Sequence, residues 1–373
     1  STTVTDPRSQ ETVYDMDRYG AVTRMVDPAG TTTTEWNYDH LSPAVITDRL
    51  GRITRRSYDT QGNMTLERIE HPSAGNLEQR WEYKEPTEFP ERPYIKNRVD
   101  FQLDARNHRT DFTYDPRGNL LSRSKAGITE SWTYLANGDI SSSVNGEGER
   151  TGYQYDSYGN QTRVESADGG ITRRTFDIRG RMRSETDPLN RVTDYSYDDL
   201  DRLVETRLPR VEGESSRPTI RVQYFDEDNL RIDSDVLGRS TSTYSDLMGR
   251  TVRVLLPPLP EGSVEILRTY DANGNLVLEV DPMLRETRMR YDASNRMELR
   301  TEPLNRQTAW TYDAEGHVLT QRTSLGADQD TRVVRYEYAH PLYKTTKTER
   351  LLRVDDVDTW LSRSQEYDGN GNL

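Results

Sequence analysis

An aromatic residue, followed by an acid and then by a glycine, recurs along the chain at a nearly constant interval. In one stretch the intervals are 20, 21, 21 and 21 residues, between Tyr114, Tyr134, Tyr155, Phe176 and Tyr197. Allowing for insertions, residues 1–373 contain about sixteen units of about 21 residues, with further aromatic positions at Tyr14, Tyr38, Tyr58, Tyr83, Tyr224, Tyr244, Tyr270, Tyr291, Tyr312, Tyr338 and Tyr367. A fixed period of this length indicates a stack of small supersecondary units, so the whole sequence is predicted to be one repeat array.

Each unit contains two turn signals. The first turn follows the aromatic residue, as in Asp156-Ser157-Tyr158-Gly159-Asn160. Its aspartate can accept hydrogen bonds from backbone amides two residues on, and its glycine adopts positive φ without strain. We expect this role for Gly118, Gly159, Gly180, Gly274 and Gly316, and for Asn295 or Asp201 where glycine is absent. The second turn lies about ten residues later, as in Asp187-Pro188-Leu189-Asn190, where proline fixes φ at the first corner.

The segments between the turns are six or seven residues long and rich in Thr, Val, Arg and Tyr. They are too short and too β-branched for helices, and they are typical of strands. Each unit is therefore two strands and two turns of an antiparallel meander, and sixteen units contain about 32 strands. The sequence predicts an all-β fold with no helix longer than about two turns.

The residue two positions before the repeated aromatic is itself aromatic in eight of the sixteen units, including Trp132 before Tyr134 and Trp310 before Tyr312. Side chains two residues apart on a strand share one face of the sheet. Stacked units are therefore predicted to form a double aromatic ladder, in which these side chains have a structural role. The alternative is that exposed tryptophans bind sugars by stacking, on a carbohydrate-binding or adhesion protein built from the same repeat.

Composition limits the chemistry of the chain. It has no cysteine, and its net charge of −13 comes from interspersed charges without the basic stripe typical of nucleic-acid binding. No apolar run reaches the length of about 18 residues that a membrane span needs. The histidines are scattered, at His40, His71, His108, His317 and His340. The loops that start at Asp271 and Asp368 lack the spacing of a calcium loop. We therefore expect no enzyme activity, no cofactor, and no catalytic or metal-binding residues.

The unit resembles the RHS repeat, also called the YD repeat, whose form is YDxxGRLxxxxDPxGxxTxYxYD. The best-matching stretch, residues 155–202, reads YDSYGNQTRVESADGGITRRTFDIRGRMRSETDPLNRVTDYSYDDLDR. The resemblance implies a ribbon of β-hairpins that coils into a spiral shell or barrel, as in Rhs toxins, the C component of Tc toxins and teneurins. In the bacterial members the shell encloses a toxic C-terminal domain until delivery.

The resemblance also implies partners and a location. The partners would be the remaining segments of the same shell, an enclosed C-terminal toxin or cargo domain, and secretion-apparatus proteins. The protein would be assembled in the cytoplasm, then secreted or delivered by a bacterial secretion system such as type VI. The sequence lacks the DPxGL signature and the variable toxin domain of whole family members, so we expect a fragment of a longer shell. Neither end resembles a capping unit, so open edges should favour self-association or require flanking segments.

Overall fold

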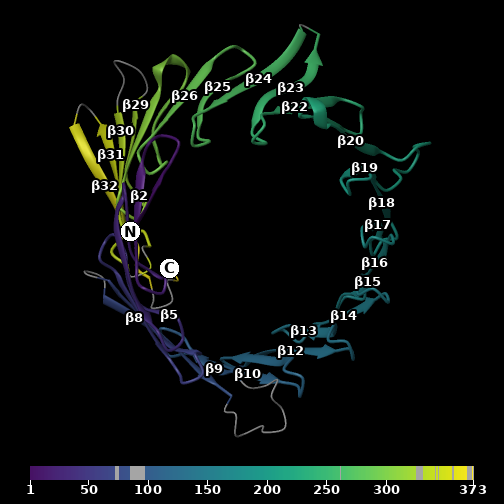
Figure 1. Ribbon diagram of the computed structural model, residues 1–373. Coiled ribbons are helices and arrows are strands. Elements are labelled where there is room, and N and C mark those ends of the chain that lie inside the picture. Colours follow the sequence, from purple (N-terminus) through teal and green to yellow (C-terminus); the bar gives the residue numbers. More distant parts are fainter. Residues whose placement is uncertain are drawn as a thin grey trace. The chain divides into compact units, whose positions relative to one another are not determined.

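The predicted all-β architecture is confirmed. The computed structural model describes residues 1–71, 75–84, 97–260, 262–324, 331–340, 342, 344–354, 357–367 and 372. These residues contain 32 strands of one antiparallel sheet and two 3-10 helices, Asp226–Asp228 and Pro303–Asn305. The chain divides into two compact units, formed by residues 1–110 with 269–373 and by residues 111–268. Figure 1 shows the strands following one another as short hairpins.

The first sixteen strands are β1 (Thr2–Thr5), β2 (Glu11–Met16), β3 (Val22–Asp27), β4 (Gly30–Asn37), β5 (Ser42–Thr47), β6 (Ile53–Tyr58), β7 (Met64–His71), β8 (Gly75–Tyr83), β9 (Val99–Leu103), β10 (Arg109–Tyr114), β11 (Leu120–Lys125), β12 (Ile128–Tyr134), β13 (Ile140–Val144), β14 (Arg150–Tyr155), β15 (Gln161–Glu165) and β16 (Ile171–Phe176). The second sixteen are β17 (Met182–Thr186), β18 (Val192–Tyr197), β19 (Leu203–Arg207), β20 (Thr219–Phe225), β21 (Leu230–Ser234), β22 (Ser240–Ser245), β23 (Thr251–Leu259), β24 (Gly262–Tyr270), β25 (Leu276–Val280), β26 (Glu286–Tyr291), β27 (Met297–Thr301), β28 (Gln307–Tyr312), β29 (Val318–Ser324), β30 (Thr331–Glu337), β31 (Lys347–Val354) and β32 (Val357–Ser364).

Both turns of a unit use the same aspartate-capped geometry. In the first turn after β14, the Asp156 amide donates to the Asn160 carbonyl at 2.9 Å and the Gly159 amide donates to the Asp156 carbonyl at 3.2 Å. The Asp156 carboxylate accepts from the amides of Tyr158 and Asn160, both at 2.9 Å. In the second turn after β17, Asp187 makes the equivalent bonds to the Leu189 and Arg191 amides. A single aspartate therefore satisfies the backbone donors of each turn.

The residue at the fourth position of the first turn has a left-handed backbone. The five glycines expected there have φ between 78° and 93°, at Gly118, Gly159, Gly180, Gly274 and Gly316. Asn295 and Asp201 replace glycine with φ of 61° and 64°. These are the residue types that tolerate this region best after glycine.

In many units strand pairing shifts by one residue directly before the repeated aromatic. In β14 the shift lies between Gln154 and Tyr155, and in β16 it lies between Thr175 and Phe176. Such a bulge bends the strand and increases its twist. The repeated aromatic therefore marks a regular bend beside the first turn, which the alternation of residue types did not predict.

The sheet has no thick core. No side chain of the described residues is less than 2% exposed. On β12, Trp132 and Tyr134 are half-buried while Thr133 between them is exposed. Ion pairs connect neighbouring strands on the solvated side, such as Arg123 with Glu130 at 2.6 Å. Exposed pairs of this kind contribute little individually, so hairpin hydrogen bonding and half-buried aromatic side chains hold the ribbon together.

Candidate functional site: a seam between turn edges

The ribbon has two edges made of turns. We call the edge formed by the turns after the repeated aromatics the first-turn edge, and the opposite edge the second-turn edge. At the first-turn edge, the repeated tyrosine joins its own hairpin to the preceding one. The Tyr155 hydroxyl donates to the Ile140 carbonyl at 2.9 Å, and the Tyr134 hydroxyl donates to the Leu120 carbonyl at 2.7 Å. These bonds hold successive first turns in a row.

The other sequence-predicted positions fall into three groups. The hydroxyls of four further tyrosines donate to the carbonyl fifteen residues earlier, at Tyr58, Tyr197, Tyr291 and Tyr312. Tyr38 instead donates to the Asp17 carboxylate at 2.6 Å. Phe176 has no hydroxyl, and Tyr114, Tyr270 and Trp310 are half-buried on β10, β24 and β28.

The last residue of the first turn is a second link that the sequence reasoning missed. Arg181 pairs with Asp177 of its own turn and with Asp201 of the next, and its guanidinium lies 4.8 Å from the Tyr197 ring centroid. Asn160 occupies the same position in another unit and donates to Asp156 at 2.9 Å. The arginine of the DxxGR pattern could have predicted this link, because the tyrosine whose ring it contacts lies sixteen residues later, in the next unit. Such arginine–tyrosine contacts stabilise adjacent repeats.

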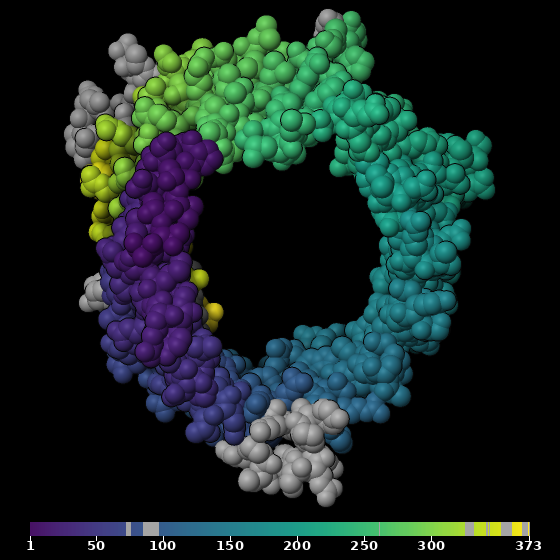
Figure 2. All heavy atoms as spheres, viewed as in Figure 1, coloured from purple at the N-terminus to yellow at the C-terminus, as the bar shows by residue number. Residues whose placement is uncertain are grey.

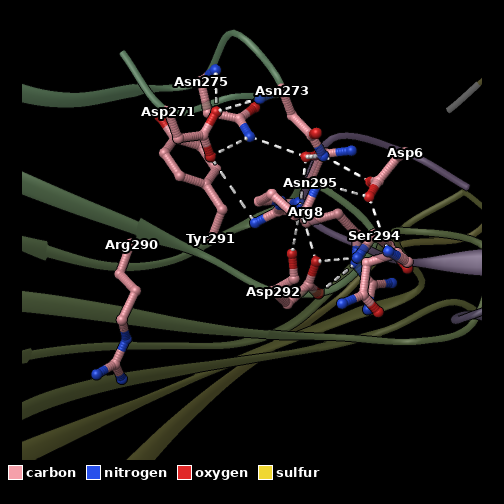
Figure 3. A network of polar contacts seen from close by, with 12 residues as sticks. Asp6, Arg8, Asp271, Asn273, Asn275, Arg290, Tyr291, Asp292, Ser294 and Asn295 are labelled. Atoms are coloured by element: carbon pink, nitrogen blue, oxygen red, sulfur yellow. Dashed lines mark hydrogen bonds and ion pairs between the residues drawn. The ribbon is translucent and has the colours of Figure 1, made fainter. Parts of the chain in front are cut away.

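The beginning of the chain contacts turns that lie far along the sequence. Arg8, in the second turn after β1, donates to the Asp292 carbonyl at 2.8 Å and to the Asn295 side chain at 2.6 Å. Its guanidinium also lies 3.9 Å from the Asp271 carboxylate. Asn273 donates to Asp6 at 2.6 Å. Figure 3 shows this network, in which residues of three turns converge.

A second set of contacts joins another second turn, at 48–51, to another first turn, at 313–316. The backbone amide of Arg49 donates to the Glu315 carboxylate at 2.8 Å, and their side chains pair at 3.6 Å. Arg49 also binds Asp27, which connects two consecutive second turns. We call the contacts of the second turns at 6–9, 27–30 and 48–51 with the first turns at 271–275, 292–296 and 313–316 the seam. In Figure 1 the purple strands of the chain's beginning lie beside the light green strands that carry these first turns.

Small residues allow the two edges to approach. The second residue of each first turn in the seam is alanine, at Ala272, Ala293 and Ala314. A cleft of about 370 Å³ follows the seam and is lined by Asp6, Asp27, Arg49, Ala293, Ala314 and Glu315 among others. Several first turns outside the seam place larger side chains at their second or third positions, such as Ile178 and Tyr158, and these are exposed. Alanine also occupies this position in the first turn after β12, at Ala136 outside the seam, so a small residue permits docking but does not by itself specify it.

Hydrogen bonds favour the ionised form of two carboxylates of the seam, Asp6 and Asp292. Hydrogen bonds from the Gln10 amide and from Asn273 lower the pKa of Asp6 from its ordinary value of 3.8. Burial raises the pKa of Asp292, but hydrogen bonds from the Arg296 amide and guanidinium outweigh burial and leave the pKa lowered. Ionised aspartates beside Arg8 and Arg49 form a polar, charge-balanced contact.

The acidic side chains of the seam are paired with arginine and amide groups. Within the described ranges, no group of three or more potential metal-ligating side chains occurs. Asp271 lies in the first of the two loops that were compared above with calcium-binding loops. Its carboxylate accepts a hydrogen bond from the Asn275 side chain and forms an ion pair with Arg8. The loop at 368–372 lies largely outside the described residues. Among the residues that the structure describes, no helix has the length and apolar character needed to cross a membrane.

Two histidines that are far apart in the sequence, His71 and His340, lie within electrostatic range of each other. Burial lowers the pKa of His71 from 6.5, and the charges of Arg52 and His340 lower it further, while Asp48 opposes them. His340 is itself buried, at 8% exposed. These residues lie 269 positions apart, so no spacing rule could have predicted their proximity.

The fold and the seam define a class of protein, an antiparallel hairpin array in which one turn edge docks on the other. Residues 134–171 and 176–210 match the family model of the RHS repeat. The chain carries RHS repeats there, and the resemblance inferred from the sequence is confirmed.

Solved structures share the fold. TcdB2-TccC3 aligns with a TM-score of 0.56 and 14% identity over 97% of this chain and 26% of that chain. TcdB2-TccC3 without its hypervariable C-terminal region aligns with a TM-score of 0.56 and 12% identity, over 94% of this chain and 23% of that chain. This chain therefore spans about a quarter of the length of the structures it matches.

Proposed function

We propose that residues 1–373 are a structural segment of a longer RHS-repeat shell that encloses a C-terminal toxin or other cargo domain until delivery. The observation that carries this proposal is the seam. The second-turn edge of β1–β6 docks on first turns far along the sequence. Arg49 contacts a residue 266 positions later, and Arg8 contacts a residue 284 positions later. A ribbon that returns to its own edge in this way can build a wall wider than one ribbon.

The proposal extends to partners and location. The remaining segments of the same array would continue the wall, and the cargo would lie inside it. The likeness in fold to TcdB2-TccC3, over about a quarter of that chain, supports a shell of this type. Secretion-apparatus proteins are further partners in this proposal. The assembled protein would leave the cytoplasm through a bacterial secretion system, of which type VI is one candidate.

A structural role accounts for the aromatic positions better than sugar binding does. The Trp36 indole donates to the Val22 carbonyl at 2.9 Å, so its polar atom already has a partner inside the ribbon. Trp132 and Trp310 are half-buried rather than displayed on a flat exposed surface. Sugar stacking needs an open ring face. The seam and the strand contacts use the repeated residues for packing, and we therefore favour the shell over a lectin.

The test is protease protection of the cargo in the complete gene product. The variant Arg8→Glu with Arg49→Glu should open the seam and expose the C-terminal domain to a protease that leaves the wild-type domain intact. Arg191→Glu is the matched control, because Arg191 pairs with Asp187 of its own turn and lies outside the seam. Equal cleavage in wild type and seam variant would contradict the enclosure. Saturable binding of the wild type to a glycan array, lost in Trp132→Ala, would favour the lectin instead.

A further inference from the structure

A pocket of about 390 Å³ lies over β29, β30 and β31, which follow one another in the sheet (Figure 1). Its lining includes three arginines, Arg306, Arg332 and Arg350, together with the polar side chains of Gln321 and Thr323. Among the described residues that line it, none is acidic. Its volume lies within the range of about 300–1,000 Å³ that is typical of sites for small molecules.

The strand register brings the polar lining residues to one face of the sheet. Thr323 pairs with Arg332, and Gln321, two residues before Thr323, pairs with Val334. Val334 pairs in turn with Arg350. Directly paired residues share a face, and so do residues two apart on one strand. Arg332 and Arg350 are therefore diagonal neighbours on the same face.

The positive charge of this pocket is only partly neutralised within the chain. Neither Arg332 nor Arg350 has an ion pair or a side-chain hydrogen bond with a residue that the structure describes. Arg306 pairs with Glu302 at 2.5 Å, but Glu302 also lies 3.1 Å from Arg300, so two arginines share one carboxylate. The pocket therefore carries an excess of positive charge in a chain whose net charge is −13.

The absence of acidic lining residues distinguishes this pocket from three other clefts of the chain. The seam cleft contains Asp27 and Glu315, a cleft beside β21 contains Asp233 and Asp235, and a cleft at the first turn after β10 contains Asp115. In those clefts a carboxylate would repel an anion. The pocket over β29–β31 offers arginines without that repulsion, so its charge favours an anionic ligand.

We propose that this pocket binds a small polyanion that carries phosphate or carboxylate groups. A guanidinium presents a planar fork of donors that matches either group in a bidentate geometry. Arg332 and Arg350 supply two such forks, and Gln321 and Thr323 supply neutral donors beside them. Two unpaired guanidinium groups are best balanced by a ligand with at least two negative charges. This inference does not depend on any enclosed cargo.

Titration calorimetry of the 373-residue chain with inorganic pyrophosphate and with citrate tests the proposal. We expect at least one of these probes to bind saturably at one site per chain, and the probe that binds more tightly assigns the phosphate or the carboxylate class. The variant Arg332→Gln with Arg350→Gln should weaken that binding about tenfold or more, because it removes charged hydrogen-bond donors. A wild-type chain that binds neither probe would overturn the proposal.

Arg322→Gln is the matched control. Arg322 is exposed and lies in β29 between Gln321 and Thr323, and it too has no ion pair among the described residues. Strand alternation places it on the opposite face from the pocket, so its replacement should change the affinity by less than about twofold, because salt screens a charge that does not contact the ligand. A loss as large as that of the double variant would show a general effect of charge and overturn the site. Circular dichroism of each variant checks that the strands are retained.

Discussion

The guanidinium of Arg8 donates to the backbone carbonyl of Asp292 at 2.8 Å, across 284 positions of sequence. Its acceptor is part of a turn repeated throughout the chain, and its other partner, Asn295, occupies the glycine position of that turn. Glycine at 295 would have no side-chain acceptor to offer. The substitution of asparagine for glycine therefore contributes a partner to the seam as well as a tolerated backbone conformation.

Arg8→Ala should destabilise the seam while leaving the strands intact. The arginine is partly exposed, so we expect a loss of about 1 kcal/mol, below the full range for charged hydrogen bonds. Hydrogen exchange should accelerate at residues 2–16 and 271–296 more than in β14–β18. A double-mutant cycle with Asn295→Ala measures the coupling between the two side chains. Additive effects of the two substitutions would contradict a direct contribution of this bond.

The repeated tyrosine is expected to stabilise the array through its hydroxyl. Tyr155→Phe removes the 2.9 Å bond to the Ile140 carbonyl and should cost about 0.5–1.5 kcal/mol. Phe176→Tyr is the reciprocal change, since it places a hydroxyl where the other fifteen units carry tyrosine, and it should be neutral or stabilising. Urea unfolding measures the change in the free energy of unfolding in both variants. Equal destabilisation by the two changes would show that ring packing, rather than the hydroxyl, dominates.

Replacing two glycines by alanine should have different effects on stability, because the two glycines have different backbone conformations. Gly159 has φ of 88°, so Gly159→Ala should cost about 1–2 kcal/mol through left-handed strain, although no atom crowds the new methyl group. Gly152 lies in β14, and its added methyl group would meet neighbours only at 3.5 Å or more. Gly152→Ala is therefore the control and should cost clearly less. Thermal unfolding monitored by circular dichroism compares the two, and a larger cost at Gly152 would contradict the turn assignment.

The sequence predicted the strands and turns, which repeat locally, but it did not predict the seam, whose residues are far apart in the sequence. The Asp-x-x-Gly spacing predicted the turns because one aspartate can cap backbone amides within its own turn, as Asp156 does. The seam depends on Arg8 and Asn273, whose residue types are ordinary for exposed turns. Nothing local indicates that they converge, because their pairing depends on how far the ribbon bends over some 270 residues. Alanine at the second position of three consecutive first turns was the available signal.

The partial burial of His71 predicts a loss of stability on mild acidification. Burial lowers the pKa of His71 in the folded chain below the value of 6.5, with Arg52 and His340 acting in the same direction and Asp48 against it. The unfolded chain then binds more protons than the folded chain just below pH 6.5, so the free energy of unfolding falls as pH decreases from that value. The decrease stops once the pH passes the lowered folded-state pKa. Asp6 and Asp292 of the seam act only at lower pH, because hydrogen bonds hold their pKa values below 3.8.

Urea unfolding at pH 7.5 and at pH 5 measures this loss. His71→Gln removes the titrating ring while keeping a polar side chain of similar length, so the difference in unfolding free energy between the two pH values should shrink. His108→Gln is the control, because His108 is an exposed histidine beside Asp104. Its replacement removes a ring that is already exposed in the folded chain and should leave the acid-induced loss in place. An unchanged pH dependence in His71→Gln would show that the loss arises at other groups.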